Sequence, residues 1–153
     1  FTAQLVAQMK PEDSLEIVEL NQVFCTHLRQ QFPQLKIHEM SILDYDPPQT
    51  YDCILSGLPL ANFPADLVDA IYQKIFQLLR PDGHFVIFHY IALREILARV
   101  GNKKTRKQLG TILHIEHQLK DLILSQTRVH FNVPPAIVTV RKRPEVIQKL
   151  LPA

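Results

Sequence analysis

The sequence contains few of the residues that mark several common classes of protein. It has four glycines, two cysteines and no tryptophan. The cysteines, Cys25 and Cys53, are isolated and form no CxxC pair, so neither a disulfide framework nor a cysteine metal site is expected. Cys53 falls within an apolar stretch, and we expect it to be a reduced, buried thiol. No apolar run approaches the roughly 20 residues that cross a bilayer, and no secretory signal is recognised, which favours a cytoplasmic protein.

The composition of the 153 residues is that of a globular protein. Hydrophobic residues make up 46% and charged residues 21%, which fits one domain over residues 1–153 with a sizeable core. The net charge of +2 is too small to indicate nucleic acid, and no nucleic-acid partner is expected. The basic cluster Lys103, Lys104, Arg106 and Lys107 could attract phosphate head groups or an anionic membrane surface. A solvated helix face or a mobile loop is the more frequent explanation of such a cluster.

Apolar periodicity predicts alternating strands and helices along the chain. Such alternation is typical of a parallel α/β sheet, and the two last strands are expected to form an antiparallel edge. The predicted strands are 14–20, 36–43, 51–55, 84–90, 121–132 and 136–141. Helices are predicted at 1–10, 21–31, from Pro64 and Asp66 to the Pro81-Asp82-Gly83 stop, and over most of 91–120, with interruptions near Gly101 and Gly110.

The stretch Tyr51–Tyr90 reads as one strand–helix–strand unit with an unusual loop after the first strand, Ser56-Gly-Leu-Pro-Leu-Ala-Asn-Phe63. Ligands of open α/β sheets bind outside the carboxyl ends of the strands, so this loop is the predicted chemical site. Gly57 would allow a close backbone approach to a ligand, and Leu58-Pro59 favours an extended turn whose carbonyls could hold an amine. Asn62 would supply an amide. The alternative is a turn that needs glycine and proline only for its shape.

Polar residues follow two earlier strands. Glu19 closes the first of them, where a carboxylate can accept the hydroxyls of a nucleoside ribose. A solvated carboxylate beside the helix that Asn21 caps is the alternative. After the next strand, Ser41 would face a cofactor base and Ile42 could pack on an adenine ring, although a plain strand-to-loop transition would look similar.

These segments resemble the class I S-adenosylmethionine-dependent methyltransferases, and among them the bacterial phosphatidylethanolamine (phospholipid) N-methyltransferases. The resemblance spans nearly the whole chain; the Ser-Gly-Leu-Pro loop and the late Asn-Val-Pro-Pro-Ala are its more specific parts. The segments that carry it are Phe1-Thr-Ala-Gln-Leu5, Ile17-Val-Glu-Leu-Asn21, Tyr51–Phe63, Leu79-Arg-Pro-Asp-Gly83, Phe88–Arg94 and Asn132-Val-Pro-Pro-Ala136.

The resemblance implies a Rossmann-like sheet with an antiparallel C-terminal hairpin and S-adenosyl-L-methionine as the cofactor. The family's first strand and GxGxG loop would precede Phe1, so we expect this chain to lack them. Met40-Ser41 replace the Gly-Asp that the family usually has there. The implied cofactor-binding residues are Glu19, Leu20, Asn21, Ser41, Ile42, Ser56 and Gly57, and the implied catalytic residues are Leu58, Pro59, Asn62 and Tyr90.

The implied reaction transfers a methyl group to the amine of a phospholipid head group at an anionic membrane surface, with peripheral attachment to the inner face of the membrane. Methyl transfer is an in-line displacement that depends on positioning and desolvation. The acceptor amine must lose a proton, for which Tyr90, His89 and the loop carbonyls are candidates. His114 and His117 around Glu116 match no strong metal spacing, so no metal site is expected.

Two other hypotheses remain open. One is a methyltransferase of another substrate class, either a small-molecule methyltransferase or, notably, an rRNA adenine dimethyltransferase. The rRNA enzymes use an Asn-Leu-Pro-Tyr-like loop whose aromatic ring stacks on the target base. The matching positions here are Gly57-Leu-Pro-Leu60, which lack the amide and the aromatic ring. The other is a non-catalytic Rossmann-like module that works through protein contacts.

Overall fold

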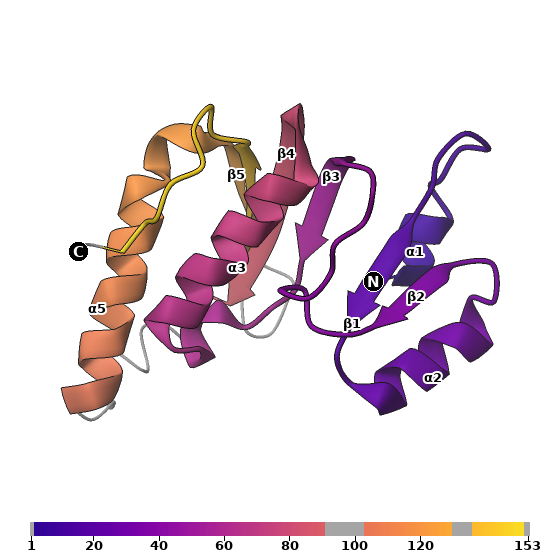
Figure 1. Cartoon of the computed structure of the whole chain (residues 1–153), viewed down its shortest axis with the longest axis horizontal. Coiled ribbons are helices and arrows are strands. Elements are labelled where there is room, and N and C mark those ends of the chain that lie inside the picture. Colours follow the sequence, from indigo (N-terminus) through magenta and orange to yellow (C-terminus); the bar gives the residue numbers. More distant parts are fainter. Residues whose placement is uncertain (1, 91–102, 130–135, 152–153) are drawn as a thin grey trace. The chain divides into compact units, whose positions relative to one another are not determined.

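The computed structural model describes the backbone of residues 2–90, 103–129 and 136–151. It describes the side chains of 2–88, 109–129 and 136–151. Contacts divide the chain into two compact units, Phe1–Asp46 and Pro47–Ala153. Within the described residues, the first unit has a two-stranded sheet and the second a four-stranded sheet (Figure 1). The assignment of both units to a single domain stays a prediction.

The first unit consists of α1 (Thr2–Val6), β1 (Glu16–Glu19), α2 (Gln22–Gln31) and β2 (Lys36–Glu39). The two strands are parallel, with Glu16 opposite Lys36 and Glu19 opposite Glu39, so their carboxyl ends are neighbours. The helix α2 packs on this pair. Its fully buried Cys25 places Sγ 3.3 Å from the carbonyl oxygen of Glu19, and burial is the main cause that raises the pKa of the Cys25 thiol.

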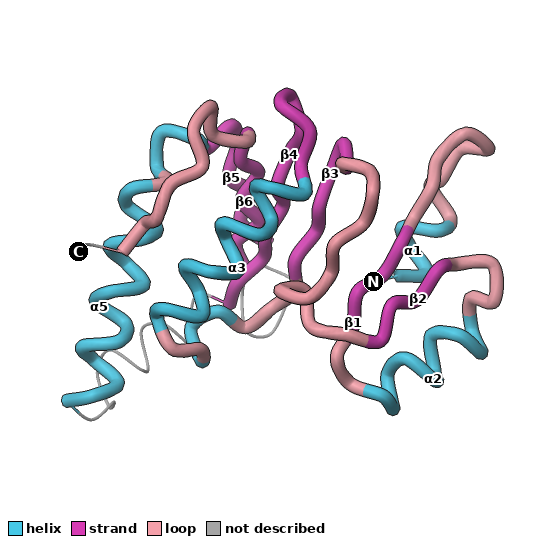
Figure 2. The backbone as a smooth tube through the Cα atoms, viewed as in Figure 1, coloured by secondary structure: helices cyan, strands magenta, loops and turns pink. Residues whose placement is uncertain are grey.

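The second unit has a mixed sheet in the order β3-β4-β6-β5 (Figure 2). The strand β3 pairs with β4 in parallel, whereas β6 pairs antiparallel with both β4 and β5. The elements are β3 (Tyr51–Ser56), the 3₁₀ helix η1 (Leu60–Asn62), α3 (Ala65–Leu78), β4 (Leu79–Tyr90), α5 (Lys103–Gln118), the 3₁₀ helix η2 (Lys120–Leu122), β5 (Ile123–Val129) and β6 (Ala136–Lys142).

The core of the second unit forms where α3 packs on β4 and against α5. The predicted apolar face of α3 is buried, and its two aromatic side chains surround the ring of Phe85 on β4. Tyr72 and Phe76 both meet Phe85 edge-on, with ring centroids 5.8 and 6.2 Å away. Three fully buried rings of this size contribute a large share of the apolar surface that folding removes from water.

A polar network lies within this core. Tyr72 Oη donates a hydrogen bond of 2.6 Å to Glu116 Oε1, and Arg141 Nη1 donates one of 3.2 Å to Tyr72 Oη. Arg141 Nη2 also pairs with Glu116 Oε2. Burial disfavours the charge of Arg141, but Tyr72 and Glu116 outweigh it and raise the pKa of the guanidinium. The network therefore ties α3, α5 and β6 together through charge-assisted bonds.

Most predicted elements are present, with differences at their boundaries. The first helix ends at Val6, the second strand at Glu39, and β4 follows α3 directly from Leu79 through the expected stop. Two predictions were wrong. The helix α5 runs without a break through Gly110, because a glycine inside a helix costs only about 1 kcal/mol. Cys53 is exposed, since β3 has a neighbouring strand on one side only within the described residues.

Three predicted features fall partly or wholly on residues that the structure does not describe. These are the helical stretch 91–102 with its break at Gly101, the end of the strand 121–132, and the Asn-Val-Pro-Pro motif within 130–135.

We expect Glu116→Ala to destabilise the protein by about 3–5 kcal/mol, because it leaves the guanidinium of Arg141, only 2% exposed, without its carboxylate. Glu39→Ala is the matched control. It removes an exposed pair with Arg29, at 2.8 Å, which contributes about 0–1 kcal/mol. Urea unfolding followed by circular dichroism measures both, and equal losses would contradict the role of the buried pair.

Candidate functional site

The carboxyl end of the first sheet brings Glu19 and Met40 together. The carbonyl oxygen of Glu19 accepts a hydrogen bond of 3.1 Å from the Met40 backbone N–H. Its side-chain Oε1 accepts one of 2.7 Å from the Asn21 backbone N–H. The carboxylate is thus fixed at the strand end, and its second oxygen remains for a further donor.

Asn21 starts α2 as its N-cap, as predicted. Its Oδ1 accepts hydrogen bonds from the backbone N–H groups of Val23 at 2.9 Å and Phe24 at 3.3 Å. The cap occupies the oxygen of this side chain, so only its NH₂ group is left for a ligand. The neighbouring Leu20 is 71% exposed and presents an apolar surface beside Glu19.

Ser41 and Ile42 follow β2 and are half-buried. Ser41 Oγ accepts a 3.2 Å hydrogen bond from the Leu43 backbone N–H, and its carbonyl oxygen accepts one of 3.1 Å from Asp44. These bonds turn the chain immediately after the strand. The first unit therefore places Glu19–Asn21 next to the segment that contains Ser41 and Ile42, as parallel pairing predicts.

A second polar cluster lies at the start of the same strands, and the sequence interpretation missed it. Glu16 accepts hydrogen bonds from Tyr45 Oη at 2.7 Å and Lys36 Nζ at 3.3 Å, and its Oε2 lies 2.8 Å from His38 Nε2. Burial alone would raise the pKa of Glu16, but these three partners outweigh it and lower the pKa to about 2. The available signal in the sequence was that Lys36 and His38 are two positions apart on a predicted strand, so both side chains lie on the same face of it.

The loop after β3 is ordered by its own hydrogen bonds. Ser56 is buried, and its Oγ accepts a 3.3 Å bond from the Leu58 backbone N–H. Pro59, at φ −78° and ψ 66°, is the centre of an inverse γ-turn in which the Leu58 carbonyl accepts a 2.8 Å bond from Leu60. The Pro59 carbonyl accepts a 2.9 Å bond from the backbone of Asn62, whose residue is exposed. The carbonyls of Leu58 and Pro59, both among the predicted acceptors, thus already accept hydrogen bonds within the loop.

The strand β4 ends beside this loop. Ser56 is opposite Ile87, so Gly57 comes next to Phe88 at the carboxyl ends of two parallel strands. Tyr90 is the last residue of β4 and pairs with Ala136 of β6, and His89 pairs with Ile137. The side chains of His89 and Tyr90 lie outside the described residues, so their catalytic roles stay predictions.

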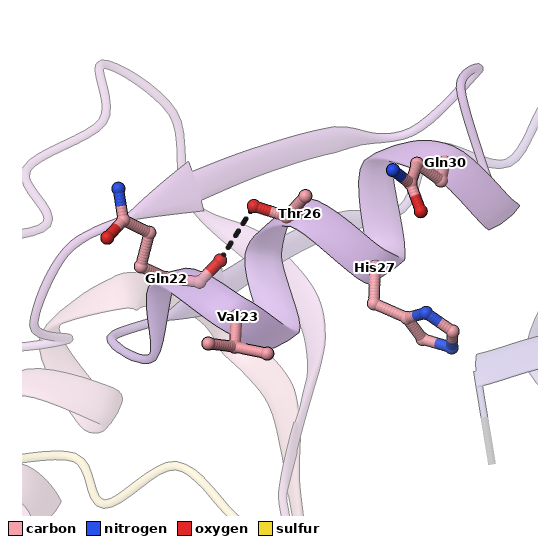
Figure 3. A pocket seen from close by; sticks show the side chains of 5 residues that line it. All are labelled: Gln22, Val23, Thr26, His27 and Gln30. Carbon is pink, nitrogen blue, oxygen red and sulfur yellow. Dashed lines mark hydrogen bonds between the residues drawn. The ribbon is translucent and has the colours of Figure 1, made fainter.

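A shallow hollow lies on the outer surface of α2 (Figure 3). The hollow is lined by residues of this helix, and none of them is an acidic residue, a lysine or an arginine: Gln22, Val23, Thr26, His27 and Gln30. Thr26 Oγ1 donates a 2.9 Å hydrogen bond to the Gln22 carbonyl within the helix itself. The hollow contains none of the predicted site residues and no converging charged groups, so it gives no sign of a catalytic centre.

Glu116 and His114 have partners other than each other. Glu116 belongs to the buried network with Arg141, and His114 Nε2 lies 3.0 Å from Gln118 Nε2. Among the described residues, no three histidine, cysteine or acidic side chains gather as metal ligands would. In the same part of the chain, no helix has the length and apolar character needed to traverse a membrane.

Known structures resemble this arrangement of elements. The N-methyltransferase NodS from Bradyrhizobium japonicum WM9 superposes with a TM-score of 0.63 at 12% identity, over 86% of this chain and 74% of that chain. The PH0226 protein from Pyrococcus horikoshii OT3 gives a TM-score of 0.66 at 12% identity, over 94% and 76%. The fold is that of the class I methyltransferases. This confirms the predicted Rossmann-like sheet with its antiparallel β5–β6 hairpin.

A third similar structure was solved with ligands. It is the 1,6-didemethyltoxoflavin-N1-methyltransferase of Burkholderia thailandensis with 1,6-didemethyltoxoflavin and S-adenosylhomocysteine bound, with a TM-score of 0.59 at 16% identity, over 94% of this chain and 66% of that chain. No family model and no curated protein matches the sequence. At these identities the likeness establishes the fold, and the reaction is a matter for proposal.

The Glu16 cluster makes an acid-dependent contribution to stability. The pKa of the Glu16 carboxyl group falls from the ordinary 4.5 to about 2 on folding. Its contribution to the free energy of unfolding is therefore complete above pH 4.5 and is lost as the pH falls towards 2. We expect Glu16→Gln to flatten the decline of melting temperature across that window, and Glu12→Gln, an exposed change in the same unit, to leave it unaltered. Thermal unfolding at stepped pH measures this, and parallel curves for wild type and Glu16→Gln would refute it.

Proposed function

We propose that this chain is an S-adenosylmethionine-dependent N-methyltransferase that acts on the amine of a phospholipid head group. The observation that carries the proposal is the loop Ser56–Pro59, whose hydrogen-bonding groups are mainly backbone N–H and C=O groups. The loop follows the carboxyl end of a parallel strand in a methyltransferase fold. Loops in this position bind the ligands of open α/β sheets.

The first unit has groups that fit a nucleoside. Glu19 offers a carboxylate oxygen to the ribose hydroxyls while its other oxygen is held by Asn21. The exposed Leu20 provides an apolar surface at the same strand end, and Ile42 would pack on the adenine ring. Ser41 Oγ already accepts a bond from Leu43, so its hydroxyl hydrogen is the part left to donate to the base.

The second unit supplies the environment of the acceptor amine. S-adenosylmethionine supplies the methyl group as a sulfonium, so that the C–S bond breaks as the N–C bond forms. A loop carbonyl orients the amine by accepting one of its N–H groups, and an oriented amine needs no covalent help from the protein. The proton that the amine releases passes to an acceptor at the end of β4, for which His89 and Tyr90 are the candidates.

The basic residues at the start of α5 support an anionic partner. Lys103, Lys104, Arg106 and Lys107 occupy its first two turns, and the first turn has no acidic residue. Cations at a helix N-terminus oppose the helix dipole, so they add nothing to the stability of the helix. A phosphate surface attracts such a segment at about 1 kcal/mol per basic residue, which supports peripheral binding to an anionic membrane.

The structure disfavours the adenine alternative. The aromatic side chain that stacks on a flipped base would stand at position 60, where this chain has a leucine that is only 5% exposed. A buried leucine beneath the turn cannot form a stacking platform. The nearby Phe63 is half-buried, and its backbone N–H is bonded to the Leu60 carbonyl.

The substrate class is tested by methyl transfer from labelled S-adenosylmethionine. We expect label in phosphatidylethanolamine vesicles that contain anionic lipid, and at least tenfold less in phosphatidylcholine vesicles, whose head group already has a quaternary amine. Label in short RNA alone would support the adenine alternative. Cofactor binding without transfer to lipid, RNA or small amines would support the non-catalytic module.

The role of Glu19 is tested by calorimetry with S-adenosylhomocysteine. We expect Glu19→Gln to raise the Kd by roughly 10- to 100-fold, because a hydrogen bond to a charged group contributes about 1.5–3 kcal/mol. Glu12→Gln, which is exposed in the same unit, should leave the Kd within twofold. An unchanged Kd in Glu19→Gln would remove the carboxylate from the cofactor site.

A further inference from the structure

The ring of Phe88 fills the space that a side chain on Gly57 would need. A Cβ added to Gly57 would lie 3.1 Å from both Cε1 and Cζ of Phe88. Ordinary van der Waals contact begins at about 3.4 Å, so even one methyl group would force the ring or the loop to shift. The glycine thus allows the loop backbone to rest directly on an aromatic ring.

Phe88 is held more firmly than the loop it supports. It lies inside β4 and pairs with Val138 of β6, while its predecessor Ile87 pairs with Ser56 of β3. Gly57 is the first residue beyond that last strand pair. The pairing therefore fixes the Phe88 backbone at the point where the chain leaves the sheet, and the ring limits how far Gly57 can move towards β4.

The hydrogen bonds within the loop do not use the carbonyl of Gly57. Within the described part of the chain, they use the carbonyls of Leu58 and Pro59 and the hydroxyl of Ser56, but not the carbonyl of Gly57. That carbonyl is attached to the Gly57 Cα, which lies beside the ring of Phe88. Its orientation consequently depends on the position of the ring.

We infer that Phe88 is a positioning residue: its ring sets the place of Gly57, whose carbonyl accepts an N–H of the substrate amine. This inference rests on the proposed N-methyltransferase function and names the acceptor within it. An amine held by one N–H has its nitrogen at a fixed place, from which the lone pair attacks the methyl carbon. A shift of about 1 Å in such a group can lower the rate by roughly 100-fold.

The test uses the full chain with Phe88→Leu, Gly57→Ala and the double variant, assayed by methyl transfer to phosphatidylethanolamine vesicles. We expect each single change to lower kcat about 10- to 100-fold. We expect Phe88→Leu, which lies outside the implied cofactor-binding residues, to leave the Kd for S-adenosylhomocysteine within threefold. In the double variant, leucine makes room for the new methyl group, so the loss is smaller than the product of the single losses. Gly110→Ala is the matched control, since an added Cβ there meets nothing within 4 Å.

Two outcomes would overturn the inference. One is an unchanged kcat in Phe88→Leu below its melting temperature, which would reduce the ring to a packing role. The other is a double variant whose losses simply multiply. Thermal unfolding of the wild type, the two single variants and the double variant distinguishes a failure of this inference from a failure of the proposed function. If the changes in melting temperature of the two single variants are not additive in the double variant, and no protein methylates an amine, then the proximity of Gly57 and Phe88 stands and the proposed reaction is rejected.

Discussion

The parallel pairing of β3 with β4 is the constraint from which the edge that carries the proposed site of the second unit follows. Parallel neighbours cannot be joined by a tight turn, so the chain must cross over through α3, which packs on β4 through Tyr72, Phe76 and Phe85. The crossover returns β4 in the same direction as β3 and places Ser56 opposite Ile87. The loop after β3 therefore lies beside the end of β4.

The first unit follows the same rule with smaller elements. Its strands β1 and β2 are only four residues long, and α2 supplies the crossover. The Asn21 cap starts this helix immediately after Glu19, and the Met40 backbone bonds back to the Glu19 carbonyl. The cap and the strand pairing together fix the carboxylate at the strand end, where the proposed nucleoside would bind. The Glu16 cluster at the opposite end of the strands adds stability without taking part in that edge.

The sequence was sufficient for features that depend on local patterns. The 3.6-residue period around Val68, Ile71 and Ile75 predicted α3, and Asn21 predicted the start of α2, because caps and apolar faces are properties of neighbouring residues. It was insufficient where a role depends on distant partners. Glu116 lies between two histidines in sequence but pairs with Arg141 and Tyr72 in space. Likewise, Cys53 in an apolar strand looked buried, and its exposure depends on which strands are neighbours.

The loop Ser56–Pro59 owes its shape more to backbone groups than to particular side chains. Its shape comes from one glycine, one proline and three hydrogen bonds whose acceptors include two backbone carbonyls. Backbone acceptors are present whatever the side chains are, so such a site requires only residues that permit the turn. The requirement falls on supporting positions such as Gly57, where an added Cβ would lie 3.1 Å from the ring of Phe88 on β4. These two residues are far apart in the sequence, so their proximity leaves no local motif.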